Sequence, residues 1–213
     1  MAEHIKAVFF DHDDTLVGTI GAKWAHHKYV ARTWYGKDLS DGEIRKHWGV
    51  PFSQLVGALY GGDNPEEAIR RNLSCEDDFP KLLLEGTFPT LRRLHSAGKI
   101  LGIITATSRR SFEHDLTLHQ FPRDIIGYTQ TEDDTTFHKP DPRVFEPAVA
   151  WLAEQDVSPG ETLYVADGLH DMRAAIGAGL NFIGVATGLV SLDEFHEAGV
   201  PAIKTLSELM PHL

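Results

Sequence analysis

The chain has 213 residues and a formal net charge of −11, which suits one large domain or a core with a smaller insertion. The acidic balance argues against a surface that binds nucleic acid or an anionic membrane, although local basic residues can still define a site for an anionic substrate. The single cysteine, Cys75, fits a reducing cytoplasm, and no apolar run approaches the roughly 20 residues of a membrane-spanning helix.

An apolar run near the start leads directly into a cluster of carboxylates. Residues 7–10 are apolar at every position, which predicts a buried parallel strand. Asp11, Asp13 and Asp14 follow where that strand ends, and ligands of open α/β sheets bind outside the carboxyl ends of strands. Such close carboxylates repel one another, and Mg²⁺ is a cation that suits oxygen ligands. The alternative is a solvated acidic turn, because Asp favours turns.

Residues 19–85 show no strong strand pattern and predict a block of short helices. The expected helices are Trp24–Tyr35, Asp41–Trp48, Phe52–Tyr60 and Pro65–Asp77. The segment Gly61-Gly-Asp-Asn64 separates the last two, because glycine and asparagine favour turns. Since strands and helices alternate only after this block, we expect it to form a helical cap inserted into a core of residues 1–18 and 86–213.

The remainder of the chain alternates between strands and helices, which predicts an α/β fold with a mostly parallel sheet and right-handed crossovers. The expected strands are Ile100–Ile104, Ile125–Tyr128, Leu163–Ala166 and Phe182–Val185, with an edge strand at Ile203. The expected helices are Thr87–Gly98, Ser111–His119, Asp141–Leu152, Leu169–Gly179 and Ser207–Met210.

When residues 7–10 are counted as the first strand, two candidate anion-binding segments follow the second and third strands. Thr105 ends the second strand, so its hydroxyl can donate to a phosphate oxygen, and the backbone N–H groups that follow, beginning at Ala106, suit an anion. Thr107 or Ser108 can equally be a helix N-cap, and both interpretations are compatible. Lys139 precedes a proline-stiffened turn, Pro140-Asp-Pro142, so it can neutralise a phosphate or a carboxylate from a fixed position. A lone surface lysine is the alternative.

Two more carboxylates mark the end of the fourth strand. Asp167 follows directly after Ala166, and Asp171 lies four residues further on, at the start of the next helix. Asp167 therefore follows the carboxyl end of a predicted strand, as Asp11 does, where ligands of open α/β sheets bind. For Asp171 the alternative is a favourable interaction with the helix dipole in the first turn.

Taken in order, these segments resemble four motifs of the haloacid dehalogenase-like hydrolases, in particular the branch of phosphoglycolate phosphatase and β-phosphoglucomutase with a helical cap after the first motif. The motif segments are Asp11-His-Asp-Asp-Thr-Leu16, Ile103–Ser108, Lys139-Pro-Asp-Pro-Arg-Val-Phe145 and Leu163–Asp171. The departures are Asp14 where Gly is common, Gly18-Thr19 where Asp-Ser is common, Ala166 for Gly, and Gly168 for Ser or Thr. The resemblance covers nearly the whole chain.

The resemblance implies a Rossmann-like parallel sheet of strand order 3-2-1-4-5 and a set of residue roles. Asp11 is the implied nucleophile that takes up a phosphoryl group, and Asp13 is the implied general acid/base. Mg²⁺ is held by Asp11, the backbone carbonyl of Asp13, Asp167 and waters, with Asp171 supporting the site outside the direct ligands or through water. The implied phosphate-binding groups are Thr105, the N–H of Ala106 and Lys139.

The implied function is Mg²⁺-dependent hydrolysis of a small phosphorylated metabolite, a phosphate monoester, by a monomer or homodimer. A phosphomutase uses the same core but needs cap groups that retain the sugar phosphate. A metal-independent 2-haloacid dehalogenase typically lacks the second Asp of the first motif, so Asp13 and Asp167 argue against it. A receiver-like signalling module is usually much shorter and has no cap.

The cap segment Trp48-Gly-Val-Pro-Phe52 resembles the substrate-facing loop of the family, although the remainder of the cap matches weakly. Large rings on a turn are costly in water unless they are buried or contact a ligand. We therefore expect Trp48 and Phe52 either to face a substrate or to pack inside the cap.

Overall fold

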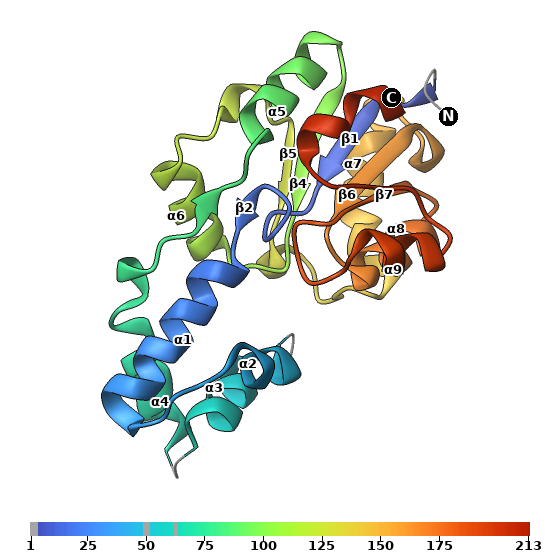
Figure 1. The fold of residues 1–213 in the computed structure, drawn as a ribbon. Helices are drawn as coiled ribbons and strands as arrows, with labels where there is room; N and C mark the ends of the chain where they lie inside the picture. The colour runs from blue at the N-terminus through green and yellow to red at the C-terminus, as the bar shows by residue number, and fades with distance from the viewer. Residues whose placement is uncertain (1–3, 49–51, 62–63) are drawn as a thin grey trace. The chain divides into compact units, whose positions relative to one another are not determined.

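The computed structural model describes residues 4–48, 52–61 and 64–213, and the chain divides into two compact units (Figure 1). The larger unit comprises residues 1–18 and 83–213, and the smaller unit comprises residues 19–82. The chain therefore leaves the larger unit after residue 18 and returns to it at residue 83.

A sheet of parallel strands forms the centre of the larger unit, and its spatial order is β5-β4-β1-β6-β7-β8. The strands are β1 (Ala7–Phe10), β4 (Ile100–Ile104), β5 (Tyr128–Gln130), β6 (Thr162–Ala166), β7 (Asn181–Val185) and β8 (Ala202–Ile203). This arrangement confirms the expected order 3-2-1-4-5 and the expected edge strand. In the register of the central strand, Phe10 lies opposite Ile103 on one side and Val165 on the other.

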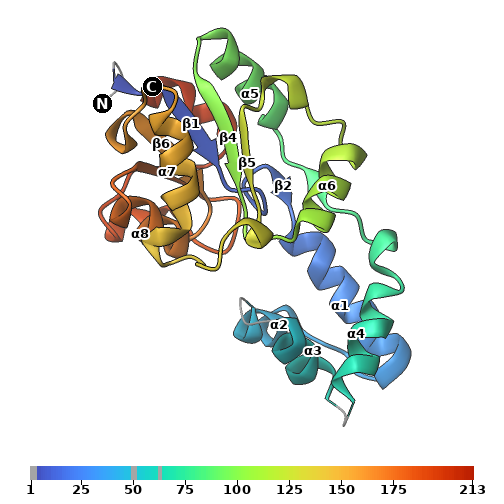
Figure 2. The same ribbon diagram turned by 180° about the vertical axis from the view of Figure 1, so that it is seen from behind.

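Helices cover both faces of this sheet, which makes a three-layer α/β/α unit (Figures 1 and 2). One face packs against α5 (Thr87–Ser96) and α6 (Arg109–Leu118), and the other packs against α7 (Glu146–Ala153), α8 (Leu169–Gly177) and α9 (Leu192–Glu197). Successive residues of β1 alternate between the two cores, because strand side chains point to opposite faces. The apolar run of β1 is therefore buried on both sides.

Several element boundaries differ from the sequence-based expectations, and proline explains two of them. The helix expected from Asp141 begins as a 3-10 turn, Pro142–Phe145, and α7 starts only at Glu146. Pro147 has no backbone N–H, so it fits the first turn of a helix and not its interior. The last expected helix is a pair of 3-10 turns, Leu206–Glu208 and Met210–His212, the second of which contains Pro211.

Two further elements of the larger unit depart from expectation. The third strand of the prediction, residues 125–128, is shifted to Tyr128–Gln130, because a 3-10 turn occupies Arg123–Ile125 directly after Pro122. The helix α9 was not expected. It begins with a capping box, in which the Ser191 hydroxyl accepts from Glu194 N–H and the Glu194 carboxylate accepts from Ser191 N–H.

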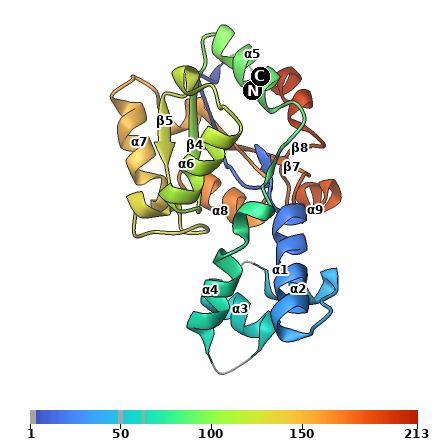
Figure 3. The same cartoon turned by 90° about the vertical axis from the view of Figure 1, so that its left-hand side faces the viewer.

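In the described residues of the smaller unit, four helices form a cluster (Figure 3), of which the first begins earlier than expected, at Ile20, and the last ends earlier, at Leu73. They are α1 (Ile20–Tyr35), α2 (Asp41–His47), α3 (Phe52–Tyr60) and α4 (Pro65–Leu73), followed by a 3-10 turn at Glu76–Asp78. Their apolar core contains Val30, Ile44, Val56 and Leu59. The chain segments at the junction of the two units, β2 (Val17–Gly18) and β3 (Leu82–Leu83), pair as a two-stranded sheet. None of the helices in the described residues is long and apolar enough to cross a membrane.

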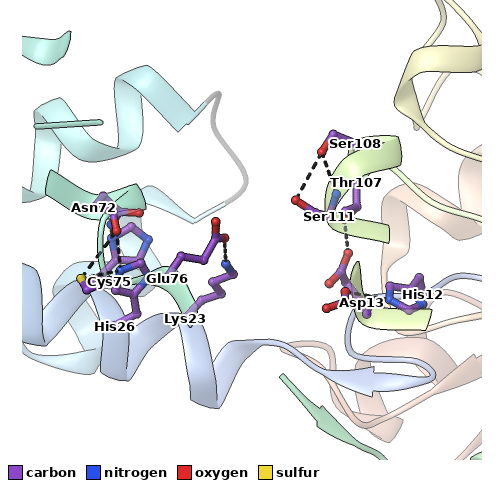
Figure 4. Close-up of polar contacts among 12 residues, drawn as sticks. His12, Asp13, Lys23, His26, Asn72, Cys75, Glu76, Thr107, Ser108 and Ser111 are labelled. Atoms are coloured by element: carbon purple, nitrogen blue, oxygen red, sulfur yellow. Dashed lines mark hydrogen bonds and ion pairs between the residues drawn. The ribbon is translucent and has the colours of Figure 1, made fainter. Parts of the chain in front are cut away.

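A buried polar network lies inside the smaller unit. His27 Nδ1 is 2.6 Å from the Tyr60 hydroxyl, which also accepts a hydrogen bond from Asn72 Nδ2 at 2.7 Å. His26 Nε2 is 2.9 Å from the Asn72 carbonyl oxygen and 3.4 Å from Cys75 Sγ (Figure 4). The network satisfies these polar atoms where water is excluded, which is the condition for burying them without a large penalty.

Candidate active site

The ends of three neighbouring strands bring the predicted site residues to one edge of the sheet. Asp11, Thr105 and Asp167 follow directly after β1, β4 and β6. The Asp11 N–H donates to Val165 O at 2.9 Å, and the Thr105 N–H donates to Gln130 O at 2.9 Å, so the backbone hydrogen bonding of the sheet extends to these residues. Because β1 lies between β4 and β6, Asp11 occupies the middle of this edge.

Lys139 joins this edge of the sheet through its ammonium group. Its Nζ lies 2.6 Å from Asp11 Oδ1 and donates to the Tyr164 hydroxyl at 2.7 Å. Asp171 Oδ1 is 2.5 Å from the same Nζ, as an ion pair outside hydrogen-bond geometry. The side chains of Lys139 and Asp11 are only 8% and 10% exposed. The lysine therefore balances two carboxylates where water contributes little.

The charges at this edge shift the pKa values of its residues. Burial, together with the charges of Asp171 and Asp13, raises the pKa of Asp11 to about 7 against the lowering effect of Lys139. Burial, followed by the charges of Asp11 and Asp171, raises the pKa of Asp167 well above its ordinary value. Burial alone would lower the pKa of Lys139, but its carboxylate partners outweigh that effect and raise it. Negative charge is in excess here, so an added cation would be favourable.

The donor set at this edge fits Mg²⁺. Within residues 4–48, 52–61 and 64–213, no three His, Cys, Asp or Glu side chains converge as a complete metal-ligand set. Asp11 and Asp167 can supply two carboxylates, and burial together with the neighbouring carboxylates raises the pKa values of both, so each would gain from a nearby cation. Mg²⁺ commonly binds through one or two carboxylates and retains several waters. A site completed by a backbone carbonyl and waters therefore suits this ion.

The loop after β1 is tightly folded and holds Asp13 beside the second motif. The Asp14 N–H donates to Val17 O at 2.6 Å, and the Leu16 N–H donates to His12 O at 2.9 Å. Asp14 has φ of 55°, a left-handed conformation that Asp tolerates better than most residues, which explains why Asp can stand where relatives often have Gly. The Thr107 hydroxyl donates to Asp13 Oδ2 (Figure 4). Asp13 is thus linked to the segment after β4.

The segment after β4 has the features of an anion-binding turn. Thr105 is buried, and its Oγ1 accepts the Thr107 N–H at 3.0 Å, an arrangement in which its own O–H can donate to an oxyanion. Ala106 is exposed. Ser108 is the N-cap of α6, with its hydroxyl accepting from Ser111 N–H at 3.4 Å (Figure 4). The capping interpretation is therefore confirmed for Ser108, and it leaves Thr105 available to a ligand.

Two glycines make room for the acidic side chains. A Cβ at Gly168 would lie 2.5 Å from Asp171 Oδ2, so the Asp171 carboxylate occupies space that a serine or threonine at position 168 would need. A Cβ at Gly188 would collide with the Asp167 carboxylate. The departure from Ser or Thr at position 168 thus removes a side chain that would crowd the Asp171 carboxylate.

Sequence analysis did not identify three residues that contribute to this site. Tyr164 lies in the middle of an apolar strand, and only its need for a hydrogen-bond partner in a buried position marks it. Gly188 follows β7 without any distinguishing pattern. His12 stands between Asp11 and Asp13, yet it is fully buried and its Nε2 contacts Asp115 Oδ2 on α6 at 3.0 Å. His12 therefore anchors the loop to α6.

The two aromatic residues of the expected cap loop differ in their surroundings. Trp48 is half-buried, and its ring lies 6.0 Å from the Trp24 ring and 6.2 Å from the His27 ring within the smaller unit. Phe52 is 40% exposed. The connecting residues Gly49-Val-Pro51 lie outside the described residues. Packing inside the helical unit thus accounts for Trp48, whereas a contact between Phe52 and a substrate stays a prediction.

Comparison with known proteins agrees with the motifs. The sequence profile described as haloacid dehalogenase-like hydrolase matches residues 8–185. The chain is 30% identical to the "Putative pyrophosphatase PpaX" of Clostridium perfringens over 201 residues, which cover 91% of this chain and 90% of the relative. It is 27% identical to the glyceraldehyde 3-phosphate phosphatase of Methanothermobacter thermautotrophicus, with 90% of each chain covered. A crystal structure titled "Putative haloacid dehalogenase-like hydrolase", from Bacteroides fragilis, has a TM-score of 0.78 at 26% identity and covers 97% of this chain and 100% of its own.

Proposed function

Because this chain belongs to the haloacid dehalogenase-like hydrolase family, we propose that it is an Mg²⁺-dependent phosphatase that transfers a phosphoryl group from a small metabolite to Asp11 and then to water. The observation that carries the proposal is the buried pair of Asp11 and Lys139, with Nζ 2.6 Å from Oδ1. A carboxylate held against a fixed ammonium at the carboxyl end of a central strand can act as a nucleophile toward an anionic substrate.

In the proposed first step, an Asp11 carboxylate oxygen bonds to phosphorus while the bond to the leaving oxygen breaks. Asp13 donates its proton to that leaving oxygen. In the second step, Asp13 takes a proton from water, whose oxygen attacks phosphorus and breaks the bond to Asp11. The products are inorganic phosphate and the leaving alcohol, and both carboxyl groups return to their starting states. The hydrogen bond from the Thr107 hydroxyl to Asp13 Oδ2 supports Asp13 as a positioned acid/base.

The charge that spreads over the transferring phosphoryl oxygens needs fixed donors, and three groups of this chain can supply them. The Thr105 hydroxyl, the Ala106 N–H and the Lys139 ammonium are the proposed donors. Mg²⁺ would be held by Asp11, the Asp13 carbonyl and Asp167, with Asp171 acting through water. When bound, it would neutralise the repulsion between the nucleophile and the phosphate.

Two substrate classes are candidates, a phosphate monoester and inorganic pyrophosphate. The resemblance to phosphoglycolate phosphatases and the relative named for glyceraldehyde 3-phosphate support a monoester. The relative named as a pyrophosphatase supports a phosphoanhydride, in which the leaving group is itself a phosphate. A β-phosphoglucomutase-like transfer would use the same core residues, with the product rephosphorylated before it leaves.

The test is phosphate release from a panel of phosphorylated metabolites and pyrophosphate, with a 2-haloacid as the competing substrate. We expect hydrolysis of at least one phosphorylated compound, loss of that activity with EDTA, and its return on addition of Mg²⁺. Full activity of the metal-stripped protein, or halide release without phosphate release, would contradict the proposal. Transfer of the phosphoryl group within a sugar phosphate, without net release, would favour the mutase alternative.

A further inference from the structure

We propose that Tyr164 is a positioning residue for Lys139, and that its hydroxyl keeps the ammonium in place while Asp11 changes its charge during turnover. The proposal rests on the proposed function, because it assumes that Asp11 accepts a phosphoryl group. It concerns a residue on β6 that lies inside the fourth motif segment but is not among the residues expected to contact substrate.

Three acceptors share the hydrogen bonds of the Lys139 ammonium. They are Asp11 Oδ1 at 2.6 Å, the Tyr164 hydroxyl at 2.7 Å and Ile104 O at 3.3 Å. An ammonium has three N–H donors and no acceptor, so these contacts use its full capacity. The Tyr164 hydroxyl in turn donates to Ile104 O at 2.9 Å. It therefore accepts from the lysine and donates to the strand end that precedes Thr105.

The tyrosine is a rigid support for this contact. Its side chain is fully buried, and its ring meets the Phe145 ring edge-on at 4.9 Å. Burial, with the charges of Asp11 and Asp171 adding to it, raises the pKa of Tyr164 well above its ordinary value, so the phenol retains its proton. A neutral phenol with its proton committed to Ile104 O presents a lone pair to Lys139 throughout the reaction.

The other partners of Lys139 do not all keep the same charge during turnover. In the proposed mechanism Asp11 becomes an acyl phosphate, and the negative charge that holds the ammonium from that side moves to the phosphoryl oxygens. Asp171 Oδ1 lies 2.5 Å from Nζ as an ion pair, so it attracts the ammonium through its charge. Tyr164 and Ile104 O are the acceptors that keep their charge through both steps, and the Tyr164 hydroxyl is the closer of the two, at 2.7 Å against 3.3 Å.

Tyr128 offers a matched control on the same sheet. Its hydroxyl donates to Gln130 Oε1 at 2.9 Å, and its ring stacks on Phe9 at 5.5 Å. Tyr128→Phe therefore also removes one tyrosine hydroxyl that has a hydrogen-bond partner, but it does not remove a partner of Lys139. Comparing Tyr164→Phe with Tyr128→Phe separates the loss of a tyrosine hydrogen bond, part-buried at Tyr128, from the loss of the lysine contact.

The experiment is a double-mutant cycle on the best substrate of the panel, with Tyr164→Phe, Lys139→Met and the double variant. A hydrogen bond to a charged group predicts a fall in kcat/KM of about 10- to 100-fold for Tyr164→Phe, while Tyr128→Phe stays close to wild type. In the Lys139→Met background, Tyr164→Phe should have no further effect, because its partner is already gone. Melting temperatures of the two tyrosine variants should be similar.

The proposal is overturned if kcat/KM of Tyr164→Phe is as high as that of Tyr128→Phe. It is also overturned if Tyr164→Phe lowers kcat/KM in the Lys139→Met background by as much as in wild type. Binding of inorganic phosphate gives a second readout that does not depend on turnover. Phosphate should raise the melting temperature of wild type and Tyr128→Phe more than that of Tyr164→Phe. If wild type hydrolyses nothing on the panel, the proposed function fails. The role of Tyr164 is then overturned as well if phosphate raises the melting temperatures of wild type, Tyr128→Phe and Tyr164→Phe equally.

Discussion

At the scale of single residues, the first motif assigns different tasks to two neighbouring carboxylates. Asp11 is buried against Lys139, whereas Asp13 is half-buried and accepts a hydrogen bond from the Thr107 hydroxyl. Different surroundings are how proteins give two carboxyl groups different roles. In our account Asp11 bonds to phosphorus, and Asp13 moves the proton.

We therefore predict that Asp13→Asn slows hydrolysis of an alkyl phosphate by about 10²- to 10⁴-fold, the usual share of general acid/base catalysis. The first step should suffer less with pyrophosphate or an aryl ester, because these leaving groups need less protonation. The measurement is the ratio of wild-type to Asp13→Asn rates across such a series. Asp14→Asn is the matched control, since Asn also tolerates its left-handed backbone. A ratio that does not vary with the leaving group would contradict the role of Asp13.

Most of the candidate site could be predicted from the sequence because its residues follow buried strands directly. Asp11, Thr105 and Asp167 are each the first residue after an apolar run, and parallel strands bring such residues to one edge. Tyr164 and Gly188 could not be predicted, because their importance depends on which side chain lies next to them in space. A tyrosine inside an apolar strand is indistinguishable from a core residue until its hydroxyl partner is known.

At the scale of elements, the helical unit is the part that we propose to select the substrate. Phe52, at the start of α3, is 40% exposed, so its ring is accessible to a ligand. Trp48 packs against Trp24 and His27 and serves the stability of the unit. Phe52 is therefore the better candidate for a contact with the organic part of a substrate.

We predict that Phe52→Ala changes the relative kcat/KM among substrates of the panel and leaves the Mg²⁺ requirement and the melting temperature nearly unchanged. Leu73→Ala, at a residue of the same unit that is 51% exposed, is the control and should leave the substrate ranking as in wild type. A uniform loss of activity on all substrates together with a lower melting temperature would show that Phe52 only packs.

The buried histidines make the stability of the helical unit sensitive to acid. Burial lowers the pKa of His27 to about 4, with the charges of His26 and Lys23 acting in the same direction. In the unfolded chain His27 titrates near its ordinary value of 6.5. Below that value the unfolded chain binds a proton that the folded unit excludes. The stabilising contribution of neutral His27 is therefore present above pH 6.5 and is lost as pH falls toward 4.

The measurement is thermal unfolding followed by tryptophan fluorescence, which reports mainly on this unit because Trp24, Trp34 and Trp48 belong to it. We predict that His27→Phe, which cannot titrate, loses less melting temperature than wild type between neutral pH and the acid end of this range. His47→Gln is the control within the same unit. An equal loss in wild type and His27→Phe would exclude His27 as the acid-sensitive group.

Element boundaries were less predictable than the elements themselves. The bounds of β1, β4, β6 and β7 were predicted to within about one residue, because a continuous apolar run marks each strand. The start of α7 depended on Pro147, and β5 was displaced by a turn after Pro122. The capping box at Ser191 was a readable signal for α9, and its short helix carries too few apolar residues for a periodic pattern.

At the scale of the whole molecule, several acidic side chains meet at the centre of one sheet edge, and the chain carries a net charge of −11. Burial and mutual repulsion raise the pKa values of Asp11 and Asp167, so the ionised site destabilises the folded protein at neutral pH. A bound cation would relieve this repulsion. Metal binding should therefore be visible as a gain in stability, independently of turnover.

We predict that Mg²⁺ raises the melting temperature of the metal-stripped protein, with a gain of about 2.7 kcal/mol in unfolding free energy when its concentration is one hundred times the dissociation constant. Asp167→Asn removes a proposed ligand and should reduce this shift. Asp193→Asn, on α9, is the control and should retain it. An undiminished shift in Asp167→Asn would place the cation elsewhere.

The central claim is that a phosphoryl group becomes covalently bonded to the Asp11 carboxylate. The most direct test is acid quenching during a single turnover with excess enzyme, followed by mass spectrometry of the peptide that contains residues 11–14. The account predicts a phosphoryl adduct on Asp11 in wild type, a larger amount in Asp13→Asn with an activated ester, and none in Asp11→Asn, which should also be inactive. Rapid turnover by Asp11→Asn, or an adduct on another residue that forms and decays at the rate of turnover, would contradict it.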